Sequence, residues 1–372
     1  MRVLVIAGEP SGDLHGAGVI RQLKKASPDC MVYGIGGDKM AAEGMELVYH
    51  IRELSVMGFW EVIQHLPLIR SVEATLESLL KVRRPDVVLL IDYPGFNLRF
   101  ARAVKKAGVK IVYYISPQVW AWNSGRVKKM KELVDKMLVV FPFEVDIYRK
   151  EGIDVEFVGH PLLEEISEPQ ERKEFCKRYG FEEGKPVLGL FPGSRKQEIE
   201  RIFPVMIGAA RILHRSAGVQ IAVGVSSILD FDFMKSFLRD DFPVQLIQHA
   251  THDIMKNSDV AMVTSGTATL ETGFFRTPMV VVYKTSMLTY LIGRMLVQIK
   301  NIGLVNIVLG KRVVPELLQW NVTPQKLSRE TLRILQDKDV HQKISNDLAL
   351  VREKLGTVGA SARVAKVILA LA

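Results

Sequence analysis

The clearest candidate for acid–base chemistry is Asp92, which follows directly on the apolar run Val87–Ile91. A short apolar run of this kind is typical of a strand covered on both faces, as in a parallel sheet. Ligands of open parallel sheets lie beyond the carboxyl ends of the strands, so this carboxylate stands where a general base is useful. A turn-forming aspartate before Pro94 accounts for the pattern equally well.

Two loops of small and hydroxyl residues are candidates for binding an anion. Ser265-Gly266-Thr267 follows an apolar run and opens an expected helix, whose first N–H groups and positive dipole end attract phosphate. Glu271 lies one turn further along, where it can accept hydrogen bonds from a sugar hydroxyl beside that phosphate. Ordinary capping of a crossover helix is the alternative.

The second loop is Pro192-Gly193-Ser194-Arg195, after the apolar run 187–191. Gly193 lets a phosphate approach the backbone, Ser194 can donate a hydrogen bond, and the permanent charge of Arg195 can grip two oxygens. Two such loops in one half of the chain favour a diphosphate held between two helix N-termini, with Arg195 neutralising charge.

Several cofactor motifs are missing from the sequence. The loop Gly34-Ile35-Gly36-Gly37 is followed by Lys39 where a dinucleotide fingerprint needs glycine, and there is no P-loop pattern. Nicotinamide chemistry and nucleotide hydrolysis are therefore disfavoured, and we expect no cofactor. Asp230-Phe231-Asp232 resembles a metal-holding Asp-x-Asp, but acids at a helix start explain it, so we expect no metal.

Apolar side chains beyond the needs of one core face occur in residues 57–84. The run has apolar residues at helical spacing and a break at Pro67, while Trp60 and Leu68 fall off the stripe. A well-buried helix is one interpretation, and a patch that dips into a membrane interface is the other.

Two later loops carry further candidates. Trp120 and Trp122 follow an expected strand, where tryptophans line a sugar or lipid groove or anchor the core. Asn306 is polar in an apolar loop, where it orients a substrate or bonds its own turn.

Composition and pattern describe a globular α/β protein. The 372 residues, 48% of them hydrophobic, suffice for two or three domains in which strands and helices alternate, with a linker at about 159–170. The net charge of +9 admits nucleic acid, anionic lipid or phosphorylated small molecules as partners, but no nucleic-acid-binding signature occurs. We expect a cytoplasmic protein, at most attached to a membrane face, whose Cys30 and Cys176 are buried reduced thiols.

Five motifs in this order resemble the lipid-A-disaccharide synthase family over essentially the whole chain. They are Gly8-Glu9-Pro10-Ser11-Gly12-Asp13, Ile91-Asp92-Tyr93-Pro94-Gly95-Phe96-Asn97, Ser116-Pro117-Gln118-Val119-Trp120-Ala121-Trp122, Pro192-Gly193-Ser194-Arg195 and Ser265-Gly266-Thr267-Ala268-Thr269-Leu270-Glu271. That family is similar to other GT-B glycosyltransferases. The resemblance implies an α/β fold with two Rossmann-like domains, a cleft between them and a C-terminal helix returning to the first domain.

On this basis we expect residues 1–165 and about 340–372 to form an acceptor-binding, membrane-facing domain, and residues 166–339 to bind a UDP-sugar. The resemblance implies transfer of 2,3-diacylglucosamine from its UDP derivative to the 6-hydroxyl of 2,3-diacylglucosamine 1-phosphate, with inversion to a β-1,6 link and no metal requirement. It also implies a homodimer with exchanged C-terminal parts, peripheral on the anionic inner face of the cytoplasmic membrane. No nucleic acid is expected as a partner.

Carried over residue by residue, the resemblance makes Asp92 the candidate base, with Glu9 and Asp13 as rivals on the neighbouring strand end. Gly95 stands where some family members have a second acid, so Asp92 is the only acid in its loop. The expected UDP-binding residues are Gly193, Ser194, Arg195, Ser265, Gly266, Thr267, Glu271 and Asn306. The expected acceptor and membrane residues are Ser11, Phe59, Trp60, Val62, Ile63, Leu66, Trp120 and Trp122.

Two other functions fit parts of the sequence. A soluble epimerase or transferase acting on UDP-N-acetylglucosamine would share the fold and both phosphate loops, but would not need the apolar patch at Phe59 and Trp60. A non-catalytic membrane-binding protein would explain the patch and the charge, but not two phosphate loops together with Asp92.

Overall fold

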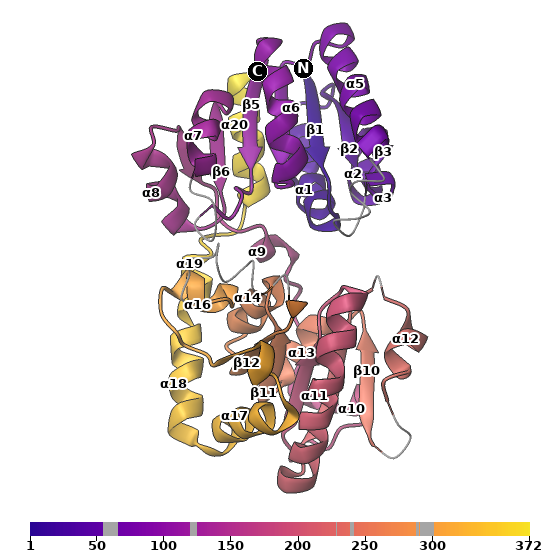
Figure 1. The fold of residues 1–372 in the computed structure, drawn as a ribbon, viewed down its shortest axis with the longest axis vertical. Helices are drawn as coiled ribbons and strands as arrows, with labels where there is room; N and C mark the ends of the chain where they lie inside the picture. The colour runs from indigo at the N-terminus through magenta and orange to yellow at the C-terminus, as the bar shows by residue number, and fades with distance from the viewer. Residues whose placement is uncertain (55–65, 120–124, 228, 239–241, 288–289, 291–300) are drawn as a thin grey trace. The chain divides into compact units, whose positions relative to one another are not determined.

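The computed structural model describes residues 1–54, 66–119, 125–227, 229–238, 242–287, 290 and 301–372. The chain forms two compact units. The first contains Met1–Glu164 and Leu355–Ala372, and the second contains Glu165–Lys354. Each unit is an α/β structure built on its own parallel sheet (Figure 1), so the predicted pair of Rossmann-like domains is confirmed.

The first unit is built on a seven-stranded sheet in the order β3-β2-β1-β4-β5-β6-β7. The inner strands β1 and β4 are almost wholly buried apolar runs, because helices cover both sheet faces. The strands are β1 (Arg2–Ala7), β2 (Met31–Gly36), β3 (Glu46–His50), β4 (Val87–Ile91), β5 (Lys110–Tyr114), β6 (Lys136–Val139) and β7 (Val155–Phe157).

Right-handed crossovers decide which helices cover which face of this sheet. The chain moves from β1 outward to β3, then returns to β4 and continues to β7, so α1 and α2 cover one face and α5 to α8 the other. The helix α20 packs against α1. The helices are α1 (Pro10–Ala26), α2 (Asp38–Ala42), α3 (Ile51–Leu54), α5 (Leu66–Val82), α6 (Pro94–Lys106), α7 (Gly125–Leu133), α8 (Pro142–Lys150), α9 (Leu162–Glu165) and α20 (Ala360–Leu371).

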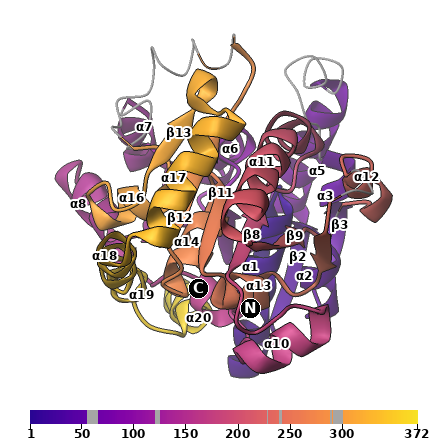
Figure 2. The same cartoon turned by 90° about the horizontal axis from the view of Figure 1, so that it is seen from below.

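The second unit repeats this plan with a six-stranded sheet in the order β10-β9-β8-β11-β12-β13. Its strands are β8 (Val187–Phe191), β9 (Gln220–Val225), β10 (Val244–Gln248), β11 (Val260–Thr264), β12 (Met279–Tyr283) and β13 (Glu316–Leu318). The helices α11 and α17 pack side by side (Figure 2). The helices are α10 (Arg172–Tyr179), α11 (Lys196–Ala217), α12 (Phe231–Lys235), α13 (Thr251–Asn257), α14 (Thr267–Phe274), α16 (Leu304–Leu309), α17 (Pro324–Gln336), α18 (Lys338–Leu348) and α19 (Leu350–Lys354).

The units differ from the expected boundaries in one respect. Residues 340–354 lie in the second unit, because α18 packs on α17 while α19 packs on α14 and α16. Only residues 355–372 return to the first unit, where α20 covers α1, β4 and β5. The predicted return of a C-terminal helix is therefore confirmed.

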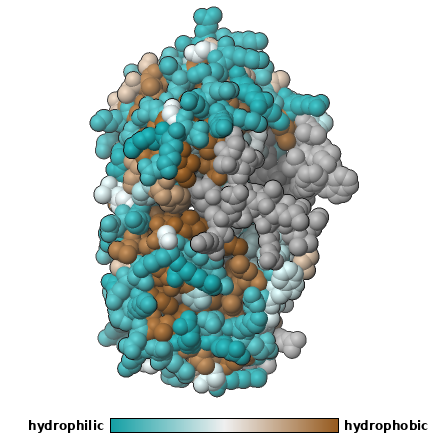
Figure 3. All heavy atoms as spheres, turned by 60° about the vertical axis from the view of Figure 1, so that its left-hand side comes forward, coloured by the Kyte–Doolittle hydropathy of each residue, from teal (hydrophilic) through white to brown (hydrophobic). Residues whose placement is uncertain are grey.

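Among the described residues, no helix is both long and apolar enough to cross a bilayer. The face drawn in Figure 3 is largely hydrophilic, with apolar residues gathered in smaller areas. The large apolar side chains that are well exposed belong to separate segments: Met31, Val82, Ile212, Met287, Trp320, Leu350 and Val358.

Candidate functional site

One candidate site lies in the first unit, where its sheet changes its direction of winding. The strands β1 and β4 are neighbours although α1 and α6 leave them in opposite directions, and Ala7 pairs with Ile91 at their carboxyl ends. The next residues along the two strands are Gly8-Glu9 and Asp92. Open α/β sheets bind their ligands at such a switch point, so the fold brings Glu9 and Asp92 together in a binding position.

Close packing fixes the geometry of this switch point. A Cβ atom at Gly8 would lie 2.3 Å from the ring carbons of Tyr93, so only glycine allows the ring to cross the loop after β1. Tyr93 in turn stacks on Phe96 with ring centroids 6.0 Å apart. The Tyr93 ring therefore fixes the loop that carries Asp92 against the loop that carries Glu9.

The carboxyl group of Asp92 is held in an unfavourable environment for its charge. Burial, and after it the negative charge of the nearby Glu9 carboxylate, raise the pKa of Asp92 to about 6. The backbone N–H of Tyr93 and the side chain of His15 oppose this shift. A pKa in that range suits a general base, since the group is ionised at neutral pH and can still take a proton.

Asp13 has a different environment from Asp92. Its side chain is 5% exposed, and its carboxylate accepts hydrogen bonds from the backbone N–H groups of Gly37 (2.7 Å), Lys39 (3.2 Å) and Met40 (3.0 Å). These bonds cap the start of α2. Glu9 and Ser11 are exposed at the start of α1, and Glu9 makes no side-chain capping bond there.

A second candidate site, in the other unit, is the switch point of its sheet. There β8 and β11 are neighbours, and Phe191 pairs with Val263. The loops that follow are Pro192-Gly193-Ser194-Arg195 and Ser265-Gly266-Thr267. The structure thus brings the two predicted anion-binding loops to adjacent strand ends within one unit.

The backbone of the Ser265-Gly266-Thr267 loop is open at Gly266, whereas a Cβ atom at Gly193 would lie 3.0 Å from Glu198 Oε2. Gly193 and Gly266 have φ values of 101° and 151°, which favour glycine, and a Cβ atom at Gly266 would meet nothing within 4 Å. Ser194, Arg195 and Thr267 are exposed.

The side chains around these loops differ in how much of their bonding capacity the fold uses. Arg195 is 56% exposed and lies 3.4 Å from Glu198, a weak pairing that leaves its guanidinium available. The Ser265 hydroxyl donates to the Ile302 carbonyl at 2.9 Å. The Thr264 hydroxyl is buried at the end of β11 with no hydrogen-bond partner among the described residues. Sequence reasoning missed Thr264 because it reads as the last residue of a strand.

Glu271 lies beside a histidine that the sequence did not single out. His252 Nε2 is 3.7 Å from Glu271 Oε2, and both side chains are partly exposed. The His252 ring also packs against Phe275. His252 begins no recognisable motif, so only the contact between α13 and α14 reveals it.

Asn306 is fully buried, and the fold uses all of its hydrogen-bonding groups. Its Nδ2 donates to the Val314 carbonyl (2.9 Å) and to Glu316 (2.8 Å), while its Oδ1 accepts from the N–H groups of Val313 (2.8 Å) and Val314 (3.0 Å). Glu316 also accepts from the N–H groups of Ile302 and Gly303. Asn306 lies in α16 rather than in a loop, and its hydrogen bonds hold the segment that follows this helix, at residues 313–316.

The expected acceptor and membrane residues fall mostly outside the part of the chain that the structure describes. Phe59, Trp60, Val62, Ile63, Trp120 and Trp122 lie outside the described residues, and only the backbone of Leu66 is described, at the start of α5. Pro67 is the second residue of α5, a position in a helix where proline is tolerated.

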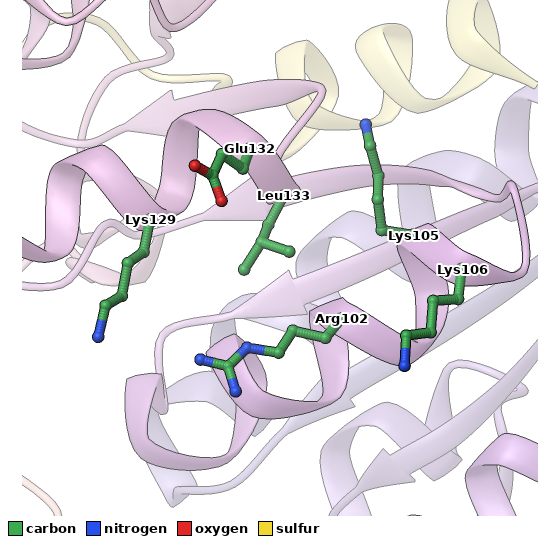
Figure 4. Close-up of a pocket in the computed structure, with 6 residues that line it drawn as sticks. All are labelled: Arg102, Lys105, Lys106, Lys129, Glu132 and Leu133. Carbon is green, nitrogen blue, oxygen red and sulfur yellow. The ribbon is translucent and has the colours of Figure 1, made fainter.

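A basic recess lies between α6 and α7 of the first unit (Figure 4). It has a volume of about 530 Å³ and is lined by Arg102, Lys105, Lys106, Lys129, Glu132 and Leu133. Lys105 also pairs with Asp135 at 3.3 Å. In the described part of the chain, no group of three or more His, Cys, Asp or Glu side chains is arranged to bind a metal.

The comparisons with known proteins agree with this architecture. The family model for lipid-A-disaccharide synthetase matches residues 3–369. The chain is 44% identical to the lipid-A-disaccharide synthase of Geobacter metallireducens, covering 99% of this chain and 96% of the relative. It is 45% identical to that of Syntrophus aciditrophicus, covering 99% and 97%.

Solved structures share the fold at low identity. A UDP-GlcNAc 2-epimerase from Neisseria meningitidis bound to UDP-GlcNAc matches with a TM-score of 0.66, 12% identity and full coverage of both chains. The glycotransferase of kitacinnamycin matches with a TM-score of 0.65, 14% identity and coverage of 100% and 98%.

Two Rossmann-like units with polar loops at their switch points are the architecture of GT-B glycosyltransferases and related epimerases. Within that class, the match over residues 3–369 and the 44–45% identity to full-length relatives decide the family. The chain belongs to the lipid-A-disaccharide synthase family, and it is a glycosyltransferase that forms the lipid A disaccharide. An epimerase or a non-catalytic membrane protein is not favoured by these relatives.

Proposed function

We propose that the enzyme transfers 2,3-diacylglucosamine from its UDP derivative to the 6-hydroxyl of 2,3-diacylglucosamine 1-phosphate, with inversion to a β-1,6 link. Family membership supports the reaction class. The observation that carries the mechanism is the Asp92 carboxyl, whose pKa is raised to about 6 at the switch point of the first sheet.

In this mechanism the Asp92 carboxylate accepts the proton of the acceptor 6-hydroxyl as its oxygen attacks C1 of the donor sugar. The bond from C1 to the diphosphate oxygen breaks, and its electron pair leaves with UDP. Glu9 sustains the basicity of Asp92 through its negative charge. Asp13 holds α2 in place through its three hydrogen bonds and takes no proton.

The second unit holds the leaving UDP. The N–H groups at Gly266 and Thr267, the N-terminal dipole of α14 and the Arg195 guanidinium stabilise charge that grows on the diphosphate. Gly193 lets the diphosphate approach, and Ser194, Ser265 and the buried Thr264 hydroxyl lie at the same strand ends. Glu271, beside His252, accepts hydrogen bonds from the ribose. Asn306 acts indirectly, by holding the loop at Ile302 that Ser265 contacts.

Two substitutions test this division of labour. Asp92→Asn keeps the size of the side chain but cannot take a proton, so we expect turnover to fall at least about 1,000-fold while UDP affinity is unchanged. Arg195→Ala should weaken UDP binding by about tenfold or more. UDP release and calorimetric UDP binding measure the two effects. Normal turnover in D92N, or a normal dissociation constant in R195A, would contradict the corresponding role.

The acyl chains of both substrates favour a bilayer, so the enzyme acts as a peripheral protein on the inner face of the cytoplasmic membrane. The helices α6 and α7 support this proposal. The α6 sequence has four Lys or Arg residues and no acid, and the α7 sequence has four Lys or Arg residues and one acid. These 22 residues together therefore have a net charge of +7, compared with +9 for the whole chain. Phosphate-bearing lipid headgroups complement such a surface.

A homodimer with exchanged C-terminal parts completes the proposal, on the strength of the family resemblance. In an exchanged dimer, the partner's copy of α20 would cover α1 in place of the chain's own. Light scattering on the purified protein decides between monomer and dimer.

A further inference from the structure

The backbone that carries Asp92 has an unusual conformation. Asp92 and the next residue, Tyr93, both have a φ of 45°, the left-handed region in which the Cβ of a non-glycine residue crowds the neighbouring carbonyl oxygen. Two successive left-handed residues that are not glycine persist only when their surroundings hold them, and such strain is concentrated at functional sites.

Two buried side chains hold this turn by its carbonyl groups. The Tyr113 hydroxyl donates to the Asp92 carbonyl at 2.6 Å, and the Asn97 Nδ2 donates to the same carbonyl at 2.8 Å and to that of Ile91 at 3.3 Å. Asn97 lies in the first turn of α6 and Tyr113 lies in β5, so the two donors come from separate elements. Both side chains are fully buried.

The Asn97 amide makes these bonds at a cost. Its Oδ1 is buried and has no hydrogen-bond partner among the described residues, and a buried acceptor without a partner destabilises a fold. Turning the amide over would bring Oδ1 against two carbonyl oxygens, so those carbonyls fix its orientation. An apolar side chain would fill this space without an unpaired acceptor, and stability alone therefore does not account for an asparagine here.

We infer that Asn97 and Tyr113 are positioning residues that clamp the Asp92 carbonyl and thereby aim the Asp92 carboxylate at the acceptor hydroxyl. This inference rests on the proposed role of Asp92 as the base. The φ and ψ of Asp92 determine the direction of its Cα–Cβ bond, so a turn that relaxes towards ordinary dihedral angles moves the carboxylate oxygens without altering any residue that contacts substrate. A displacement of about 1 Å is enough to lower a rate about 100-fold.

The test uses Tyr113→Phe, which keeps the ring and removes only the hydroxyl, and Asn97→Ala. We expect kcat to fall about tenfold in Y113F and about 100-fold in N97A, with KM for both proposed substrates and the dissociation constant of UDP unchanged. The acidic limb of the kcat/KM profile should also move, because a displaced carboxylate is differently buried. Tyr49→Phe is the matched control: it removes a hydroxyl that bonds Thr75 at 3.1 Å between β3 and α5 of the same unit.

The outcomes separate this inference from the proposed function. Turnover by D92N would remove Asp92 from the role of base. The positioning role alone would be overturned if D92N is inactive while Y113F and N97A both have a normal kcat and an unshifted pH profile. The positioning role would also be overturned if kcat falls only in proportion to a lowered melting temperature while the acidic limb of the kcat/KM profile stays at the wild-type pH. If N97A does not fold, Y113F decides.

Discussion

The chemical character of the first unit's site comes from what surrounds Asp92. The carboxyl is partly shielded from water by burial and lies near the negative charge of Glu9, and both effects disfavour its ionised form. The Tyr93 N–H limits the shift, so the group remains ionised at neutral pH. A base of this kind is stronger than an ordinary aspartate without being protonated at pH 7.

The pH dependence of the rate follows from this pKa. Since a base must be ionised to act, kcat/KM should fall about tenfold for each pH unit below about 6 and level off above it. In Glu9→Gln the negative neighbour is gone, so the midpoint should move to lower pH. Initial rates from about pH 3 to about pH 8.5 give both midpoints, and an acidic limb near the ordinary aspartate value of about 4 in the wild type would contradict the assignment.

Stability should depend on pH in the opposite sense to activity. The pKa of Asp92 is higher in the folded protein than in the unfolded chain, so folding favours the protonated form. The loss of folding stability caused by ionised Asp92 is absent below about pH 4, grows between about pH 4 and 6, and is complete above about pH 6. At pH 8 we expect D92N to have a higher melting temperature than the wild type, with a free energy of unfolding larger by up to about 3 kcal/mol. At pH 4 the two proteins should melt at the same temperature. Scanning fluorimetry measures both.

The position of Asp92 could be predicted from sequence, because it depends only on a strand end. The task of Asp13 could not, since the three N–H groups that it caps are 24 to 27 residues away and meet it only in the folded sheet. For Asn306 the sequence left open whether it orients a substrate or bonds its own turn. An asparagine among apolar residues is the same sequence pattern whether its side chain joins a buried hydrogen-bond network, as it does here, or contacts a ligand.

At the scale of elements, we expect UDP binding by the two loops of the second unit to depend on their backbone more than on their side chains. Gly266→Ala should weaken UDP binding at least about tenfold, because it adds strain at φ 151° and a methyl group at the start of α14. Gly218→Ala is the matched control: Gly218 has φ 62° with open space around it, but it ends α11. The control should lower stability only, and equal UDP affinity in the two variants would contradict the phosphate role of Gly266.

The bounds of a strand were predictable from sequence where the strand is buried on both faces. The strands β4 and β8 begin and end where their apolar runs do, since burial demands an uninterrupted apolar sequence. The edge strands β3 and β13 were not predicted. Glu46-Leu-Val-Tyr-His50 and Glu316-Leu-Leu318 are short, partly exposed and headed by an acid, so nothing in their pattern separates them from loops.

At the scale of the whole molecule, the net charge is concentrated rather than spread. Arg102→Glu, Lys106→Glu and Lys129→Glu together reverse three charges of the recess between α6 and α7. Each cation near an anionic membrane contributes about 1 kcal/mol, so binding to phosphatidylglycerol vesicles should weaken at least about 100-fold. Lys173→Glu, Lys177→Glu and Lys343→Glu change the charge equally on exposed helices of the second unit and should weaken binding much less. Equal losses in the two triple variants would indicate that only net charge matters.

The division of the chain into units was predictable in outline but not at its second boundary. The sequence predicts three successive helices from Thr323 onward, but the unit to which each helix belongs depends on the face that it buries. The helices α18 and α19 bury theirs against α17, α14 and α16, while Glu164 bonds the N–H and hydroxyl of Ser361 and so ties α20 to the first unit.

The interruption of the first unit by the second has a consequence during synthesis on the ribosome. Residues 165–354 can complete their fold as soon as they emerge, whereas the earlier residues 1–164 lack the cover over α1, β4 and β5 until residues 355–372 are translated. While residues 165–354 are translated, the nascent chain therefore exposes an apolar face on the very unit that carries Asp92. Chaperone binding to stalled nascent chains should peak in that interval and end once residues 355–372 have emerged.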